Sequence, residues 1–144
     1  MKASLIEKLD KSRYNLIKWF TLGWSIWFGG FILNGLISNR LLHILIVLLG
    51  LIGGVVYAIN LFRLLKISKI VNGNIDLRNA LNDELIMHNR LKSFRVGYWT
   101  LIVLISIFFG LSIYTSIPAL VVCEITLFFG VLSGLISFLI YNRV

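Results

Sequence analysis

Four apolar runs dominate the sequence, and each is long enough, at about 20 residues, to cross the roughly 30 Å hydrocarbon core of a bilayer as an α-helix. They cover residues 17–38, 41–62, 96–114 and 118–141. Because lipid offers no hydrogen-bond partners, a spanning segment must satisfy its own backbone, which favours helices over strands. The chain is 58% hydrophobic, above the roughly 45–50% of soluble domains. We therefore expect an all-α membrane protein with four transmembrane helices.

The placement of the basic residues predicts how the chain sits in the membrane. Of the 14 Lys and Arg residues, only Arg40 falls in a loop on the side of the two hairpin tips. Short loops rich in Lys and Arg stay in the cytoplasm. We therefore expect both termini and the connection at 71–95 to be cytoplasmic, in a multi-pass protein of the bacterial inner membrane. Anionic headgroups are the expected partners of these cations, and the same topology explains the net charge of +8 without nucleic acid.

Similar short stretches recur at a nearly constant spacing and indicate an internal repeat. "SIWFG" at 25–29 matches "SIFFG" at 106–110, an offset of 81, and "GLIGG" at 50–54 matches "GVLSG" at 130–134, an offset of 80. This predicts two tandem helical hairpins of the same orientation, one within 1–70 and one within 96–144, joined by a cytoplasmic helix at 71–95. Chance similarity between apolar helices is the alternative.

Small residues four positions apart mark close helix contacts in the second and fourth runs. Gly50 and Gly54 form one such pair, and Gly130 and Gly134 form the other. This spacing lets helix backbones approach closely. We expect the second and fourth spans to meet at the centre of the protein, with a homo-oligomer contact as the alternative.

Glu124 is the only ionisable residue well inside a span. It lies six positions after Pro118, which is about 9 Å along a helix. An ionisable group in a span is costly and is a functional candidate by default. The partners expected near its depth are Arg40 and His43, with Asn34 a further polar group. Two interpretations stay open, namely a proton or cation site and a structural bond between two helices.

The segment at 71–95 combines an imperfect apolar stripe with charged residues. Asp76 suits a helix N-cap, and the helix is expected to continue into the third span. One interpretation is a partner-binding segment and the other is a solvated connector that holds anionic headgroups. Its candidate interaction residues are Asp83, Glu84, His88 and Arg90.

The stretch "LNDELIMHNRLKSFR" at 81–95 resembles the "NDE"-type juxtamembrane stretch of small uncharacterised bacterial proteins with four transmembrane helices. That resemblance implies topology and no activity. Small multidrug transporters are also short four-span proteins, but they carry their carboxylate in the first span, which has none here.

Residue types that do chemistry are few and scattered. The sequence contains no recognisable catalytic set, a single cysteine, Cys123, and too few ligands around His88 for zinc, so we expect no catalytic residues, no metal and no cofactor. The sequence favours a non-enzymatic accessory protein that contacts another membrane protein or a second copy of itself. The alternative is a small transporter or channel subunit that uses Glu124.

Overall fold

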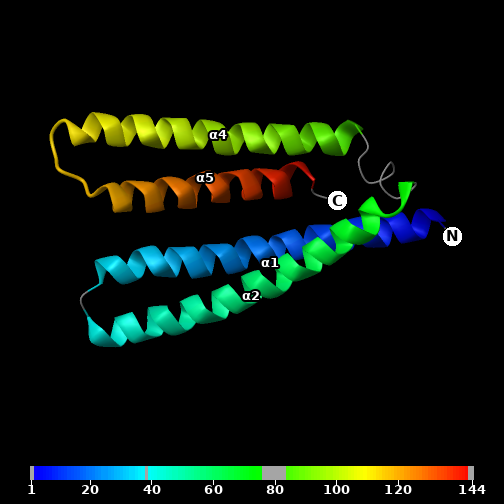
Figure 1. Ribbon diagram of the computed structural model, residues 1–144, viewed down its shortest axis with the longest axis horizontal. Coiled ribbons are helices and arrows are strands. Elements are labelled where there is room, and N and C mark those ends of the chain that lie inside the picture. Colours follow the sequence, from blue (N-terminus) through cyan, green and yellow to red (C-terminus); the bar gives the residue numbers. More distant parts are fainter. Residues whose placement is uncertain (1, 38, 76–83, 143–144) are drawn as a thin grey trace.

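The computed structural model describes residues 2–37, 39–75 and 84–142. Within them the chain forms four helices, α1 (Lys2–Leu36), α2 (Arg40–Asn72), α4 (Glu84–Ser112) and α5 (Ala119–Tyr141). Each helix is long and apolar enough to cross a membrane, which confirms the all-helical, four-span prediction. The first two and the last two form antiparallel hairpins whose tips lie at one end of the molecule (Figure 1).

The helices differ in length, and this shows which parts leave the bilayer. The 23 residues of α5 extend about 34 Å, close to the thickness of the hydrocarbon core. The 35 residues of α1 extend about 52 Å, so α1 projects well beyond the end of α5. The expected spans 17–38 and 41–62 describe the membrane-crossing parts of α1 and α2, and both helices extend beyond them toward the end that carries the chain termini.

Local sequence signals account for the ends of α2. The side chain of Asn39 accepts a hydrogen bond from the backbone nitrogen of Leu41, at 3.0 Å, and caps the first turn. At the other end the backbone N–H of Gly73 donates to the carbonyl of Lys69, and that of Asn74 donates to the carbonyl of Val71. The helix break that Gly73 and its flanking asparagines predict within 71–74 is therefore present. The expected helix start at Asp76 lies outside the described residues.

The four helices form a row in the order α4, α5, α1, α2 (Figure 1). Helices α1 and α2 pack along much of their length, as do α4 and α5, and the hairpins meet through α1 and α5. The expectation that the second and fourth spans meet is therefore wrong. Each glycine strip is used inside its own hairpin, and both faces of each helix are apolar, so the pattern did not indicate the partner.

Glycines bring the backbones of the first hairpin together. A methyl group at Gly53 would lie 2.8 Å from the backbone nitrogen of Trp27, and one at Gly54 would lie 3.2 Å from the Trp27 ring. Gly50 is buried, and a methyl group added to it would lie 3.9 Å from the carbonyl oxygen of Trp27. On the opposing helix a methyl at Gly23 would lie 2.6 Å from the backbone nitrogen of Tyr57. Only glycine permits this approach.

The second hairpin packs in the same way through different positions. A methyl group at Gly97 would lie 3.0 Å from the carbonyl oxygen of Gly130 and 3.4 Å from the Cα of Gly134. Gly130 also faces the side chain of Leu101. Under the 81-residue offset Gly97 corresponds to Leu16 and not to Gly23 or Trp27, so α1 and α4 pack through non-equivalent residues, whereas under the 80-residue offset Gly130 and Gly134 of α5 correspond to Gly50 and Gly54 of α2. The repeat remains a prediction.

An aromatic pair joins the hairpins. The rings of Phe28 on α1 and Phe128 on α5 stack with centroids 6.1 Å apart and planes 6° apart. A methyl group at Gly29 would lie 3.5 Å from the Phe128 ring, so Gly29 leaves room for it. Phe28 also stacks on Trp24 at 4.9 Å, which extends the aromatic contacts back into the first hairpin.

Hydroxyl side chains in the helices bond within their own helix. Thr21, Ser25, Ser93 and Thr126 each donate to the carbonyl four residues earlier. Among the described residues, the side-chain hydrogen bonds that cross between helices come from Asn89, whose Nδ2 reaches the C-terminal end of α5. Packing between the hairpins therefore depends on dispersion and ring stacking.

Candidate functional site

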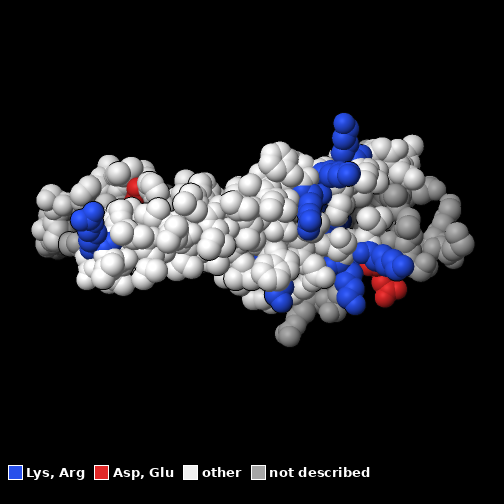
Figure 2. Space-filling model, turned by 90° about the horizontal axis from the view of Figure 1, so that it is seen from below, with Lys and Arg blue, Asp and Glu red and all other residues white. Residues whose placement is uncertain are grey.

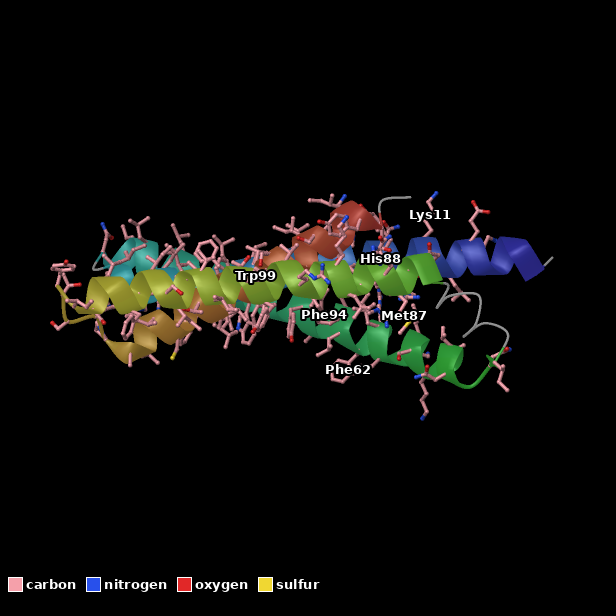
Figure 3. The ribbon with its side chains drawn as sticks, turned by 90° about the horizontal axis from the view of Figure 1, so that it is seen from above. Lys11, Phe62, Met87, His88, Phe94 and Trp99 are labelled. Carbon is pink, nitrogen blue, oxygen red and sulfur yellow. The ribbon has the colours of Figure 1, made fainter. Side chains whose placement is uncertain are left out.

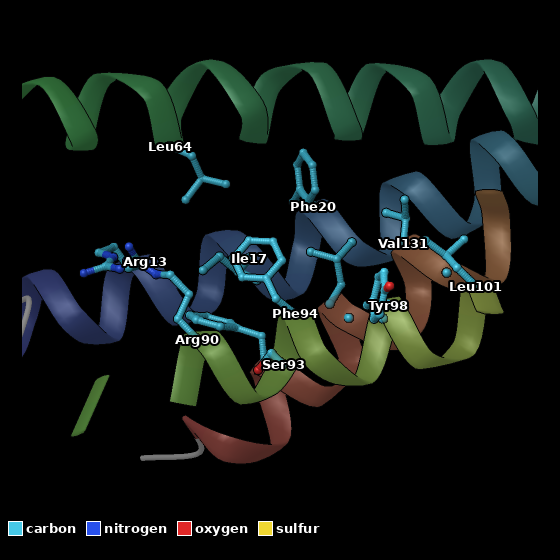
Figure 4. A pocket seen from close by; sticks show the side chains of 15 residues that line it. Arg13, Ile17, Phe20, Leu64, Arg90, Ser93, Phe94, Tyr98, Leu101 and Val131 are labelled. Atoms are coloured by element: carbon cyan, nitrogen blue, oxygen red, sulfur yellow. The ribbon is translucent and has the colours of Figure 1, made fainter. Parts of the chain in front are cut away.

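A largely apolar groove of about 540 Å³ lies between the two hairpins. All four helices line it, so it exists only when both hairpins are in place. We call it the inner groove. Figure 4 shows Arg13 and Arg90 at one end of it and Leu101 and Val131 at the other. The residues between them are almost all apolar, among them Ile17, Phe20, Leu64, Phe94 and Phe138.

Contacts at the end of α5 fix the level of the basic end of the groove. The Nδ2 of Asn89 donates to the carbonyl oxygen of Tyr141, at 3.0 Å. The ammonium of Lys92 lies 4.8 Å from the centre of the Tyr141 ring. Tyr141 is the last residue of α5, the helix whose length matches the hydrocarbon core. Arg90, next to Asn89 in the chain, therefore lies level with the C-terminal end of α5.

The two arginines come from different hairpins and face the same space. Both side chains are half-buried. Both line the inner groove, and both also line an adjoining cavity of about 440 Å³, together with Ser68 and Asn72. They are close enough to repel one another, while Asp10 attracts Arg13. Neither guanidinium makes a hydrogen bond or ion pair with any described residue. The basic end of the groove thus holds two positive groups that lack a bonded partner.

Glu124 does not form the expected pair. Its side chain is half-buried on α5, whereas Arg40 and His43 are exposed on α2. No hydrogen bond or ion pair links Glu124 to another residue in the described ranges. The expected pairing failed because it required α2 and α5 to pack together. Instead a cavity of about 560 Å³ is lined by α1, α2 and α5 in the outer half, without Glu124.

Asn34 is half-buried near the tip of the first hairpin. Its Oδ1 is buried and accepts no hydrogen bond from the described residues, and the buried Nε1–H of Trp24 donates none to them. A buried polar atom without a partner costs about 1–3 kcal/mol in soluble proteins. Asn34 makes no recorded bond to Glu124 among the described residues, and its position inside the membrane stays a prediction.

The expected cytoplasmic interaction residues do not share one surface. His88 is exposed, while Arg90 turns toward Arg13 in the inner groove and away from the position expected of a cytoplasmic contact. Glu84 begins α4, and Asp83 lies outside the described residues. Within the described ranges no group of three or more His, Cys, Asp or Glu side chains lies close enough together to hold a metal ion.

Basic side chains gather at the end of the molecule that carries the chain termini. Figure 2 shows them there and, separately, at the hairpin tips, with an uncharged belt between. The tip group contains Arg40, at the start of α2. This distribution fits four helices that cross a membrane.

In comparisons with protein-family models, curated proteins and solved structures, nothing matches this chain. The resemblance to small four-span bacterial proteins therefore stays a prediction, and function has to be argued from the site.

Proposed function

We propose that this protein is a non-enzymatic accessory protein of the bacterial cytoplasmic membrane that binds another membrane protein through its cytoplasmic end. In this proposal both termini and the connection between α2 and α4 face the cytoplasm, because the basic residues gather at that end. The hairpins anchor the chain, and the binding surface lies where the helices leave the bilayer.

Exposed apolar side chains at that end carry the proposal. Ile70, Ile75, Met87 and Leu91 are exposed by 52%, 75%, 59% and 61%. In this proposal they lie close to the level of Arg90 and Tyr141, where the lipid tails end, and Leu91 is one residue nearer the bilayer than Arg90. Apolar patches in contact with water mark interaction sites. We call these four residues the cytoplasmic apolar surface.

On α4 this surface is confined to one side of the helix. Met87 and Phe94 project from one side, and His88 and Trp99 project from the opposite side (Figure 3). Met87 and Leu91 are four residues apart and so share a face. An apolar helix face that is open to the cytoplasm suits the docking of a partner helix. Such helix pairs make contact through apolar side chains three or four residues apart.

Site-specific photocross-linking in living cells tests the proposal. A photoreactive amino acid at Met87 or Leu91 should yield discrete protein adducts. The same group at Phe109 or Leu120, which are 73% and 69% exposed near the hairpin tips, should not. Two differently tagged copies of the chain distinguish a homo-oligomer from a different partner. Equal adducts at all four positions, or none at any, would reject the proposal.

The topology is tested separately. In a Cys123→Ser background, a membrane-impermeant maleimide added to intact spheroplasts should label a cysteine at Ser116 and should spare one at Lys11. The reverse pattern would overturn the assigned orientation.

A transport function through Glu124 gains no support from its surroundings. The carboxylate lines neither the inner groove nor the outer cavity. An accessory role is therefore the function that the described geometry favours.

A further inference from the structure

The inner groove has the two halves of an amphiphile-binding site. Its basic end, with Arg13 and Arg90, lies level with the C-terminal end of α5, which the proposed topology places at the boundary between core and headgroups. From there the groove continues into the membrane along α4 as far as Leu101. Eleven residues separate Arg90 from Leu101, which is about 16 Å of helix. That length equals one leaflet of a hydrocarbon core roughly 30 Å thick.

Charge at the basic end selects the sign of the ligand. Two guanidinium groups repel one another there, and among the described residues Asp10 is the carboxylate that acts on Arg13. Two positive groups against one negative group leave an excess of positive charge. Guanidinium binds phosphate oxygens through parallel N–H donors, so a phosphate between the arginines would satisfy both and end their repulsion.

The apolar walls of the inner groove determine what the remainder of the ligand can be. Ile17, Phe20, Phe94, Leu101 and Val131 offer an apolar surface that suits an acyl chain. A zwitterionic headgroup would bring an ammonium group toward the arginines, and a free phosphate would leave the apolar walls unfilled.

We infer that the inner groove binds one anionic phospholipid of the inner leaflet, with its phosphate between Arg13 and Arg90 and an acyl chain along the apolar walls. Because the arginines belong to different hairpins, the bound lipid bridges α1 and α4. This site is separate from the cytoplasmic apolar surface, so either can fail without the other.

Native mass spectrometry of the full chain in detergent micelles tests this inference. The probes are equimolar dioleoyl phosphatidylglycerol and dioleoyl phosphatidylcholine. The wild-type chain should retain one phosphatidylglycerol in preference to phosphatidylcholine. Each basic group near an anionic lipid contributes about a fivefold gain in affinity, so Arg13→Gln with Arg90→Gln should reduce retention about 30-fold.

A matched control removes the same charge elsewhere. Arg63 and Lys66 are exposed on α2 and line no part of the inner groove, so Arg63→Gln with Lys66→Gln should leave retention within about twofold of wild type. If the glutamine variant does not fold, Arg13→Lys with Arg90→Lys keeps both charges. It should retain the preference for phosphatidylglycerol with weaker binding, because lysine lacks the paired donors.

Four results would overturn the inference. They are equal retention of the two lipids by the wild type, an equal loss in the control, binding of water-soluble glycerol phosphate as strong as that of the lipid, and a peptide or second chain in the groove. Selective loss at the arginines together with weak glycerol phosphate binding supports it.

Discussion

Gly23→Ala is the sharpest test of how the first hairpin packs. The added methyl group would lie 2.6 Å from the backbone nitrogen of Tyr57 and 3.0 Å from the carbonyl oxygen of Gly53. Both are backbone atoms, so neither can rotate away. Ordinary contact begins at 3.4 Å, so α1 and α2 must separate locally by about 0.8 Å. A gap of this size removes roughly a quarter to a half of the dispersion energy of each contact across it.

The expected loss of stability is about 1–3 kcal/mol, the usual cost of overpacking a close interface. Titration of the micellar protein with SDS, followed by tryptophan fluorescence, measures it. Trp24 and Trp27 on α1 lie 5.6 and 5.4 Å from the Tyr57 ring on α2, centre to centre, so their emission reports separation of the two helices.

The matched control is Gly35→Ala on the same helix. A methyl group at Gly35 meets nothing within 4 Å, so its unfolding free energy should equal or slightly exceed that of the wild type, because alanine favours the helix. Equal stability of Gly23→Ala and Gly35→Ala would refute the close crossing of α1 and α2.

Three further predictions concern the joint between hairpins and the polar groups. Phe128→Leu removes the stack on Phe28, worth about 0.5–1.5 kcal/mol beyond apolar burial. It should therefore broaden the distance distribution between spin labels on the two hairpins, and an unchanged distribution would contradict the stack. Glu124→Gln should shift the SDS unfolding free energy by less than about 0.5 kcal/mol, since the carboxylate has no bonded partner; a larger loss would reveal a bond. Asn89→Ala should cost about 1 kcal/mol and speed amide exchange near Tyr141, and normal protection there would rule out that hydrogen bond.

The sequence predicted the number of spans because bilayer thickness sets their length and the backbone must bond to itself. It also predicted the end of α2, because Gly73 and its flanking asparagines interrupt the helix, and it identified the glycine strips of α2 and α5 but not Gly23 and Gly97 on the helices that face them. These features depend on short stretches of chain.

Helix partners were not predictable in the same way. Lipid-facing and protein-facing surfaces are both apolar here, so periodicity does not show which helix a glycine strip meets. Gly130 was expected to face α2 and faces α4. The stack of Phe28 on Phe128 joins positions 100 residues apart, and no local pattern links them.

Arg13 was missed as a site residue for a related reason. In the sequence it is one of several cations before the first span, and Arg90 is one of several in the connection. Only the fold shows that these two turn toward the same groove, 77 positions apart. Their charge helped to predict the topology, but that rule depends on how many cations lie on each side and does not say where each side chain points.

The absence of cross-helix hydroxyl bonds in the described part of the chain has a mechanical consequence. Each hairpin is locked internally by glycine contacts, while the two are joined along one apolar line between α1 and α5. Tilting one hairpin against the other would break none of the recorded hydrogen bonds. Bilayer thickness and lateral pressure therefore act first on the angle between the hairpins, and that angle sets the width of the space between Arg13 and Arg90.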